Sequence, residues 1–250
     1  MAEQINPIDN SPILRPGFGL IDGKIRVLSP INPYRAAREL LGGSEYSSRH
    51  GLLAEHLFIL VAALIFPDIP ESELARLGSY AGLHDLGKSA LLPIVIKRDL
   101  NPLERGLLHQ HPEVAAKLLS GWPNVPPDLF TMTTLHHERQ NGEGYPKGLK
   151  AGDIPWQASM MAVVDVLVTV TAPRPWENKV LTFSDGLGTI DEEASRGRQH
   201  GQTVAILIKA LPSLQDGSIV DRFADNPTVL RSLYTLAPIY NWPTPPLSTT

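Results

Sequence analysis

Two adjacent histidines, His136 and His137, stand shortly before a glycine-rich stretch that ends in Gly144, Tyr145 and Pro146. Imidazoles are common metal ligands, and neighbouring residues of a helix point about 100° apart. We therefore expect the two rings to straddle a cleft, with each imidazole serving a different metal ion. The glycines predict a loop whose backbone can approach a bound molecule closely.

Three further histidines and two acids extend this pattern along the chain. They are His50, His84, Asp85, His111 and Asp165. Asp165 lies in an otherwise apolar segment, where a carboxylate is costly to bury without a cation or a strong donor. These residues predict a site with two metals, in which ions about 3.5–4 Å apart share a bridging hydroxide and a bridging carboxylate. Asp85 is the candidate bridge.

The composition limits the kinds of metal ligand and of binding partner that the chain can have. The chain contains no cysteine, which excludes disulfides, thiolate metal ligands and cysteine nucleophiles. Histidine and carboxylate ligands favour iron or manganese, with zinc as the alternative. The net charge is -4 and no basic run is present, so we expect no polymeric nucleic acid as partner.

Two further features bear on location. The longest apolar run, residues 57–66, is shorter than the roughly 20 residues that cross a membrane. The N-terminus shows no secretory signal. We expect a cytoplasmic protein that does not bind a membrane.

Helical patterns dominate from residue 34 onward and predict an all-α bundle. We expect helices over 49–65, over 67–88 with Gly87 as its C-terminal cap, two within 101–121, one over 127–140, one over 154–172 and further helices beyond. The second helix of the 101–121 pair should begin at Pro112. Residues 1–33 are rich in Pro and Gly, and their β-like run at 24–31 predicts an edge strand or an extended arm. The expected organisation is an N-terminal extension, 1–33, and one domain, 34–250.

The motifs resemble those of a known family. HDLGK at 84–88 resembles the signature of the HD phosphohydrolase superfamily. HHERQNGEGYPKGLKAGDIP at 136–155, followed by VVDV at 163–166, is similar to the extended signature of the HD-GYP family. The separations between the motifs fit as well, and the resemblance covers roughly residues 45–212. It implies an HD-type helical bundle, a di- or trinuclear metal centre and hydrolysis of cyclic di-GMP to linear pGpG. Whether pGpG is cut further to GMP is left open by the sequence.

The resemblance also implies roles, position by position. Seven residues match its metal ligands: His50, His84, Asp85, His111, His136, His137 and Asp165. Lys88 matches a lysine that contacts phosphate, so Asp85 and Lys88 are the expected catalytic residues. The expected substrate-binding residues are Lys88, Gly144, Tyr145, Pro146 and Arg174. A cyclic dinucleotide is the implied substrate. A diguanylate cyclase (GGDEF) domain and a second copy of the chain are further candidate partners.

The chain departs from the family pattern at several positions. Tyr46 stands where proteins with a third metal carry a glutamate, which favours two ions. Asn141, Val168 and Glu177 replace two acids and a base. These changes motivate two alternatives: a catalytically weak sensor that uses the face of the GYP loop, and an HD phosphohydrolase with another nucleotide substrate. We expect His56, His109 and His200 to be structural or surface residues.

Overall fold

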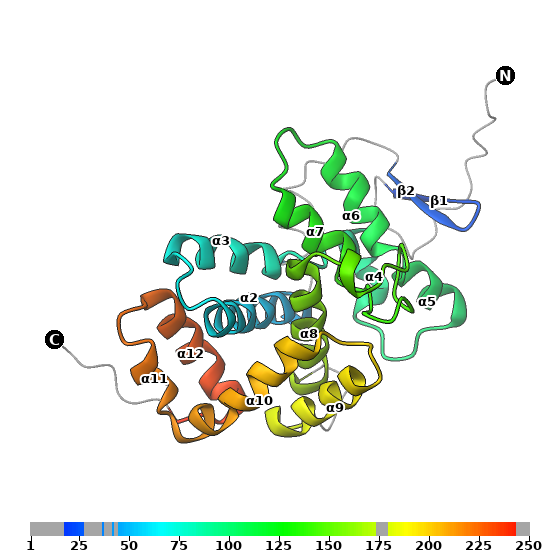
Figure 1. Cartoon of the computed structure of the whole chain (residues 1–250). Coiled ribbons are helices and arrows are strands. Elements are labelled where there is room, and N and C mark those ends of the chain that lie inside the picture. The colour runs from blue at the N-terminus through cyan, green and yellow to red at the C-terminus, as the bar shows by residue number, and fades with distance from the viewer. Residues whose placement is uncertain (1–17, 28–36, 38–41, 43–44, 174–179, 244–250) are drawn as a thin grey trace.

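The computed structural model describes residues 18–27, 37, 42, 45–173 and 180–243. Almost all of its regular structure is helical, as predicted (Figure 1). The strands are β1 (Phe18–Ile21) and β2 (Lys24–Val27). The helices in the first half are α2 (Glu45–Ile65), α3 (Glu71–Gly82), the 3-10 helix η1 (Leu86–Leu91), α4 (Leu92–Val95), α5 (Pro102–Leu108), α6 (His111–Ser120) and α7 (Pro127–Leu135). The second half contains the 3-10 helix η2 (Ala151–Asp153), α8 (Trp156–Thr171), α9 (Phe183–Ser195), α10 (Gly201–Asp216), α11 (Ile219–Arg222) and α12 (Pro227–Tyr240).

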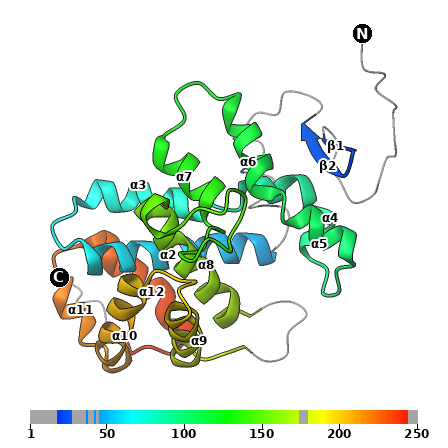
Figure 2. The same cartoon turned by 45° about the vertical axis from the view of Figure 1, so that its right-hand side comes forward.

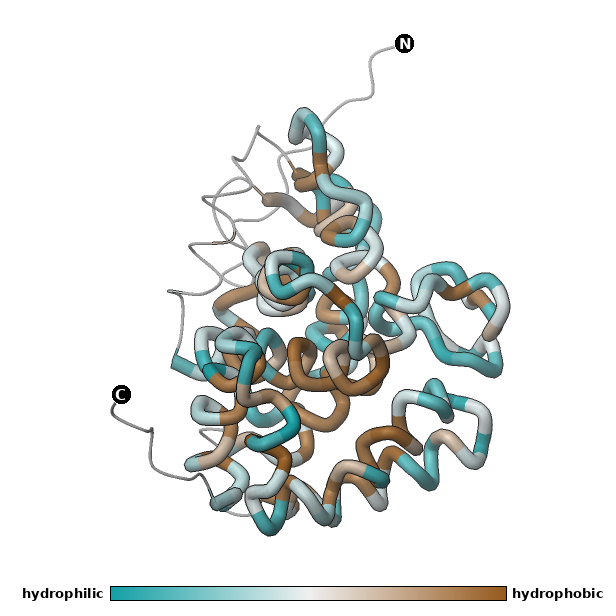
Figure 3. Tube along the Cα trace, turned by 60° about the vertical axis from the view of Figure 1, so that its left-hand side comes forward, coloured by the Kyte–Doolittle hydropathy of each residue, from teal (hydrophilic) through white to brown (hydrophobic). Residues whose placement is uncertain are grey.

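Helix α2 is the centre of the larger hydrophobic core. It packs against α3, α8, α10 and α12, and side chains such as Leu57, Phe58 and Leu60 are completely buried. The hydropathy-coloured trace shows the apolar segments gathered in the interior (Figure 3). By length and composition α2 could cross a membrane, but 72% of its apolar window is buried inside the protein.

A smaller core joins η1, α6 and the N-terminal strands. Phe18 and Ile25 pack with residues of η1 and α6. The strands pair antiparallel, with Phe18 opposite Val27, and lie beside α6 (Figure 2). The Ile25 N–H donates to Gln110 Oε1 at 2.9 Å, and Gln110 Nε2 donates to the Gly23 carbonyl at 2.7 Å. The predicted strand is confirmed over Lys24–Val27, and residues 28–31 lie outside the described part of the chain.

The predicted C-terminal end of helix α3 is wrong. The helix ends at Gly82 instead of continuing to Gly87, because the N–H groups of Leu83 and His84 bond three residues back, to Tyr80 and Ala81. Gly87 lies inside η1 and is not a cap. A Cβ there would come within 1.8 Å of the His111 carbonyl oxygen. Its lack of a side chain lets η1 pack against the start of α6.

Helix α7 likewise ends at Leu135, five residues before the predicted end. The adjacent histidines follow it in a turn. Helix α6 begins at His111, one residue before the predicted Pro112. The candidate ligands of this half of the chain therefore lie at helix ends and turns.

Candidate metal centre

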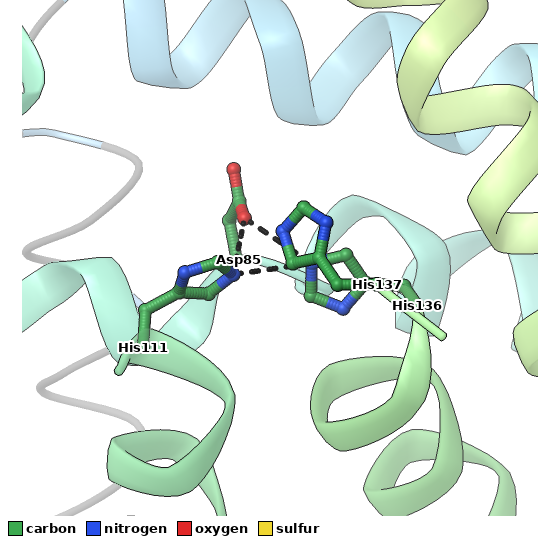
Figure 4. Close-up of side chains that lie close together, drawn as sticks. All are labelled: Asp85, His111, His136 and His137. Carbon is green, nitrogen blue, oxygen red and sulfur yellow. Dashed lines mark hydrogen bonds and ion pairs between the residues drawn. The ribbon is translucent and has the colours of Figure 1, made fainter. Parts of the chain in front are cut away.

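All seven predicted ligands come together, in two groups. Within each group the ligand atoms lie within 4.8 Å of one another. We call the first of them the Asp85 group; it contains Asp85, His111, His136 and His137 (Figure 4). The group named the Asp165 group contains His50, His84 and Asp165.

The adjacent histidines do not divide between the two groups, so that expectation is wrong. The rings of His136 and His137 lie 4.1 Å apart and both belong to the Asp85 group. The expectation assumed helical geometry at these residues. Because α7 has already ended, the angle between neighbouring helical side chains does not apply to them.

Asp85 faces both groups. Its Oδ1 lies 3.4 Å from His111 Nε2 and 3.6 Å from His136 Nε2. Its Oδ2 lies 3.5 Å from His84 Nε2 and 3.7 Å from His50 Nε2. A carboxylate with one oxygen toward each group has the geometry of a bridging ligand.

Backbone carbonyls orient three of the imidazoles. Nδ1 of His84 donates to Ala81 O at 2.7 Å, and Nδ1 of His111 donates to Leu108 O at 2.7 Å. Nδ1 of His136 donates to Met132 O at 2.8 Å. Each bond places the Nδ1 proton on the outside of the site and turns Nε2 toward the centre, the usual arrangement of metal-binding histidines.

Burial and charge set the protonation states in the Asp85 group. Burial lowers the pKa of His111, His136 and His137, so these imidazoles are neutral near pH 7. Burial alone would raise the pKa of Asp85, but the positive charges of Lys88 and His84 outweigh it and hold that pKa well below its ordinary value. The group therefore combines neutral imidazoles with an ionised carboxylate.

The Asp165 group differs in the state of His84. Burial acts to lower the pKa of His84, but the carboxylates of Asp85 and Asp165 outweigh burial and raise it. Asp165 has a pKa well below its ordinary value, because its contacts with His50 and His84 outweigh burial. The His50 Nε2 atom lies 3.2 Å from Asp165 Oδ1.

The donor set of the Asp85 group fits a divalent metal ion. His111 Nε2 and His136 Nε2 face each other at 3.1 Å, although the Nδ1 bonds make both of them acceptors when the rings are neutral. Two lone pairs at that distance repel unless a cation lies close to both. Asp85 Oδ1 is buried and has no hydrogen-bond partner in the described part of the chain. A cation bound by these N and O atoms would satisfy all three.

Lys88 lies at the edge of the centre. Its Nζ donates to Asp85 Oδ2 at 2.6 Å, and 19% of its side chain is exposed. Burial acts to lower its pKa, but the charges of Asp85 and Asp165 outweigh burial and raise it, so Lys88 stays protonated. It lines a pocket beside the ligands together with Tyr46 and Ser47.

Glu138 anchors the loop that carries Gly144, Tyr145 and Pro146. Its buried carboxylate accepts the N–H of Lys147 at 2.7 Å and that of Leu149 at 2.8 Å. Sequence reasoning missed this residue, although an acid directly after two candidate ligands and before a glycine-rich loop was a usable signal.

Gly144 is required by the protein's own backbone. The expected approach of this glycine to a nucleotide stays a prediction. A Cβ at this position would lie 2.3 Å from Arg139 N and 2.5 Å from His137 O. The next residue, Tyr145, donates its N–H to the same His137 carbonyl at 3.1 Å. The loop therefore folds back tightly onto the segment that carries the adjacent histidines.

Tyr145 stacks on two imidazoles. Its ring lies 4.6 Å from that of His137, at 18°, and 4.7 Å from that of His109, at 12°. Burial raises the pKa of its hydroxyl, which stays protonated. His109 is exposed, as expected of a surface residue, but its contact with Tyr145 was not foreseen.

Of the other residues discussed from the sequence, those that the structure describes lie outside both ligand groups. His56 is structural, as expected, with Nδ1 3.1 Å from Ser232 Oγ between α2 and α12. Val168 is fully buried in the larger core, and Asn141 pairs with Lys150 at the base of the loop. Arg174 and Glu177 lie outside the described residues.

Comparisons with known proteins give consistent matches. A model of the HD domain matches residues 54–216. The chain is 31% identical over 153 residues to the cyclic di-GMP phosphodiesterase PA4108 of Pseudomonas aeruginosa, covering 60% of this chain and 36% of that protein. It is 34% identical over 130 residues to the cyclic di-GMP phosphodiesterase response regulator RpfG of Xanthomonas campestris, covering 51% of this chain and 32% of that protein. The chain thus spans about a third of the length of these relatives.

A solved structure shares the fold. It is that of Bd1817, described as an HDG"Y"P protein, from Bdellovibrio bacteriovorus. The TM-score is 0.52 at 19% identity, with 66% of this chain and 52% of that chain covered. At this identity the likeness supports the fold and nothing further.

Proposed function

Because this chain belongs to the HD domain family, we propose that it is a metal-dependent phosphodiesterase that hydrolyses cyclic di-GMP to linear pGpG. Its HD-GYP resemblance, first seen in HDLGK and HHERQNGEGYP, is confirmed by its relatives. The observation that carries the proposal is the approach of His111 Nε2 to His136 Nε2, two acceptors 3.1 Å apart. They lie beside Asp85 Oδ1, which has no hydrogen-bond partner among the described residues.

The seven clustered residues are the proposed ligands of two divalent ions, iron or manganese, with zinc as the alternative. When bound, such ions neutralise charge on a phosphoryl group and generate a nucleophile from water at neutral pH. Asp85 holds the two groups at a fixed separation, since each of its oxygens faces one of them. The backbone-bonded imidazoles keep their Nε2 atoms aimed inward.

Lys88 is the proposed phosphate contact. Its ammonium group is protonated, lies next to Asp85 and is partly exposed, so it can donate to a phosphoryl oxygen or stabilise the leaving 3′ oxygen. The loop with Gly144, Tyr145 and Pro146 is the proposed substrate-binding element, held in place by Glu138. The assignment of Arg174 to the substrate, the GGDEF partner, the homodimer and the cytoplasmic location stay predictions.

Elemental analysis combined with turnover tests the proposal. The purified protein is assayed anaerobically with iron or manganese restored, beside a His84→Ala, Asp85→Ala double variant. His200→Ala is the control, because this histidine lies at the start of α10 and outside both ligand groups. We expect about two ions per chain and loss of hydrolysis only in the double variant.

Product analysis separates the alternatives. Chromatography shows whether pGpG is cut further to GMP, and parallel assays with other cyclic dinucleotides test the substrate class. Bound metal or bound nucleotide without turnover under any metal would contradict the enzyme and favour the sensor.

A further inference from the structure

Three rings form a series from the metal centre to the surface. His137 belongs to the Asp85 group, Tyr145 stacks on it at 4.6 Å, and His109 stacks on Tyr145 at 4.7 Å. His137 and Tyr145 are partly buried, and His109 is exposed. Tyr145 therefore lies between an inner imidazole and an outer one.

This position decides which part of Tyr145 is available to a substrate. The angles of 18° and 12° show near-parallel stacking on both imidazoles, so the ring faces are already engaged within the protein. The hydroxyl is different. It lies at the edge of the ring, away from the two stacked faces, where it can form a hydrogen bond with a substrate.

Hydrogen bonds fix the backbone around His109, although its side chain lies at the surface. It is the C-terminal cap of α5, and its N–H donates to Arg105 O at 3.0 Å. The next residue, Gln110, is bonded on both sides of its amide to the N-terminal hairpin. The backbone that carries His109 is thus fixed from two directions, which suits a side chain that has to hold another ring in place.

We infer that His109 is a positioning residue, which covers the outer side of the Tyr145 ring so that Tyr145 meets the substrate through its hydroxyl instead of stacking on a base. The inference rests on the proposed function for the identity of the substrate. It assigns a role to a residue that is not one of the seven proposed ligands. It also implies that a guanine base is recognised elsewhere than on the Tyr145 ring.

The first test follows the ring itself and needs no activity. A 3-fluorotyrosine is placed at position 145, and its fluorine resonance is compared among the unmodified protein, His109→Ala, His109→Phe and Leu103→Ala. Leu103 is the matched control, because it is exposed on the same helix. We expect a changed shift and line width in His109→Ala, a line width restored by His109→Phe, and no change in Leu103→Ala. An unchanged resonance in His109→Ala would overturn the inference, whether or not the protein hydrolyses anything.

The second test asks whether His109 acts through the Tyr145 hydroxyl. KM and kcat for cyclic di-GMP are measured for His109→Ala and Tyr145→Phe and for the double variant, with metal content as a check. We expect His109→Ala to raise KM about two- to twelvefold, the range of one aromatic pair, with kcat and metal content unchanged. His109→Phe should restore KM.

The double variant gives the sharper result. In the Tyr145→Phe background, His109→Ala should have no further effect, because the hydroxyl it positions is gone. Equal effects in both backgrounds would overturn the inference while leaving the proposed function intact. If the unmodified protein shows no turnover, the proposed function fails, and the same cycle is measured on the Kd for cyclic di-GMP. No binding in that case would overturn the role toward the substrate as well.

Discussion

The Asp85 group and the Asp165 group are built in different ways. In the Asp85 group every ligand lies at the end of a helix or in a turn, and its histidines are neutral. In the Asp165 group, His50 and Asp165 come from within the long helices α2 and α8, and His84 has a raised pKa. The geometry of the Asp85 group thus depends on where short elements end. That of the Asp165 group depends on the packing of two central helices, with only His84 coming from a turn, after α3.

Substitution of Asp85 should have the largest effect and should act on both groups alike, because Asp85 is the residue common to them. Asp85→Asn keeps the shape of the side chain but loses the charge that faces His111 on one side and His84 on the other. We expect metal occupancy to fall in both groups and turnover to fall at least about 1000-fold.

Metal content and kcat measure this effect, with Asp128→Asn as the control. Asp128 is a carboxylate outside the centre that bonds to Arg76 and Gln157. Retention of one full ion in Asp85→Asn would mean that Asp85 serves a single group.

Gly87→Ala should affect the Asp85 group more than the Asp165 group. The new Cβ would lie 1.8 Å from His111 O and 2.9 Å from Ala115 N, so η1 must move away from α6. We expect the free energy of unfolding to fall by about 3 kcal/mol and the Asp85 group to lose its ion before the Asp165 group does.

Urea titration and metal analysis check this result. Gly106→Ala is the matched control, because a Cβ there meets nothing within 4 Å and alanine favours a helix. A Gly87→Ala protein as stable as Gly106→Ala would show that the contact between η1 and α6 is not tight.

Acidification should lower the free energy of unfolding of the metal-free protein, because of the histidines of the Asp85 group. The pKa values of its three histidines are lowered by burial, so their contribution to stability is present above the unfolded pKa of about 6.5 and is lost as the pH falls below it. Each histidine contributes up to about 1.4 kcal/mol per pH unit in that window. His84 has the opposite sign, because its raised pKa stabilises the fold at low pH.

Unfolding free energies between pH 7.5 and 5.5, measured without metal, test this balance. We expect a net decrease on acidification, a flatter profile in His111→Asn and a steeper one in His84→Asn. Asp85 and Asp165 have lowered pKa values, so their contributions are lost only below about pH 4. A flat profile in the unmodified protein would contradict the neutral state of the histidines in the Asp85 group.

The smallest effect should come from the loop that follows the Asp85 group. Glu138→Gln replaces one of the two oxygens that accept the N–H groups of Lys147 and Leu149. We expect a loss of about 1–2 kcal/mol in unfolding free energy, with both ions retained. Thermal melts measure it beside Glu143→Gln, an exposed acid near Arg198, which should change stability by less than about 0.5 kcal/mol. Equal effects of the two substitutions would mean that Glu138 does not anchor the loop.

The sequence was sufficient to identify the candidate ligands and the helical bundle. Residue type and spacing picked out His84, Asp85 and His111, and the apolar pattern of α2 placed it in the core. The end of α3 was not predictable in this way, because Leu83 and Leu86 continue an apolar helical pattern past Gly82. That end depends on tertiary contact, since η1 turns away to pack against α6.

The division of the ligands and the stack on Tyr145 required the structure for the same reason. Which group a ring joins depends on backbone direction after the last helical turn, as His136 and His137 show. The contact of His109 with Tyr145 joins segments 36 residues apart, and no local pattern encodes it.

The three carbonyl bonds to Nδ1 have a consequence for the entropy of ion binding. Each acceptor lies three or four residues before its own histidine, at Ala81, Leu108 and Met132, so the local chain fixes each ring. The rotational freedom of these side chains is lost when the protein folds and not when an ion arrives. An arriving ion therefore meets ligands that are already immobilised, and little conformational entropy remains to oppose its capture.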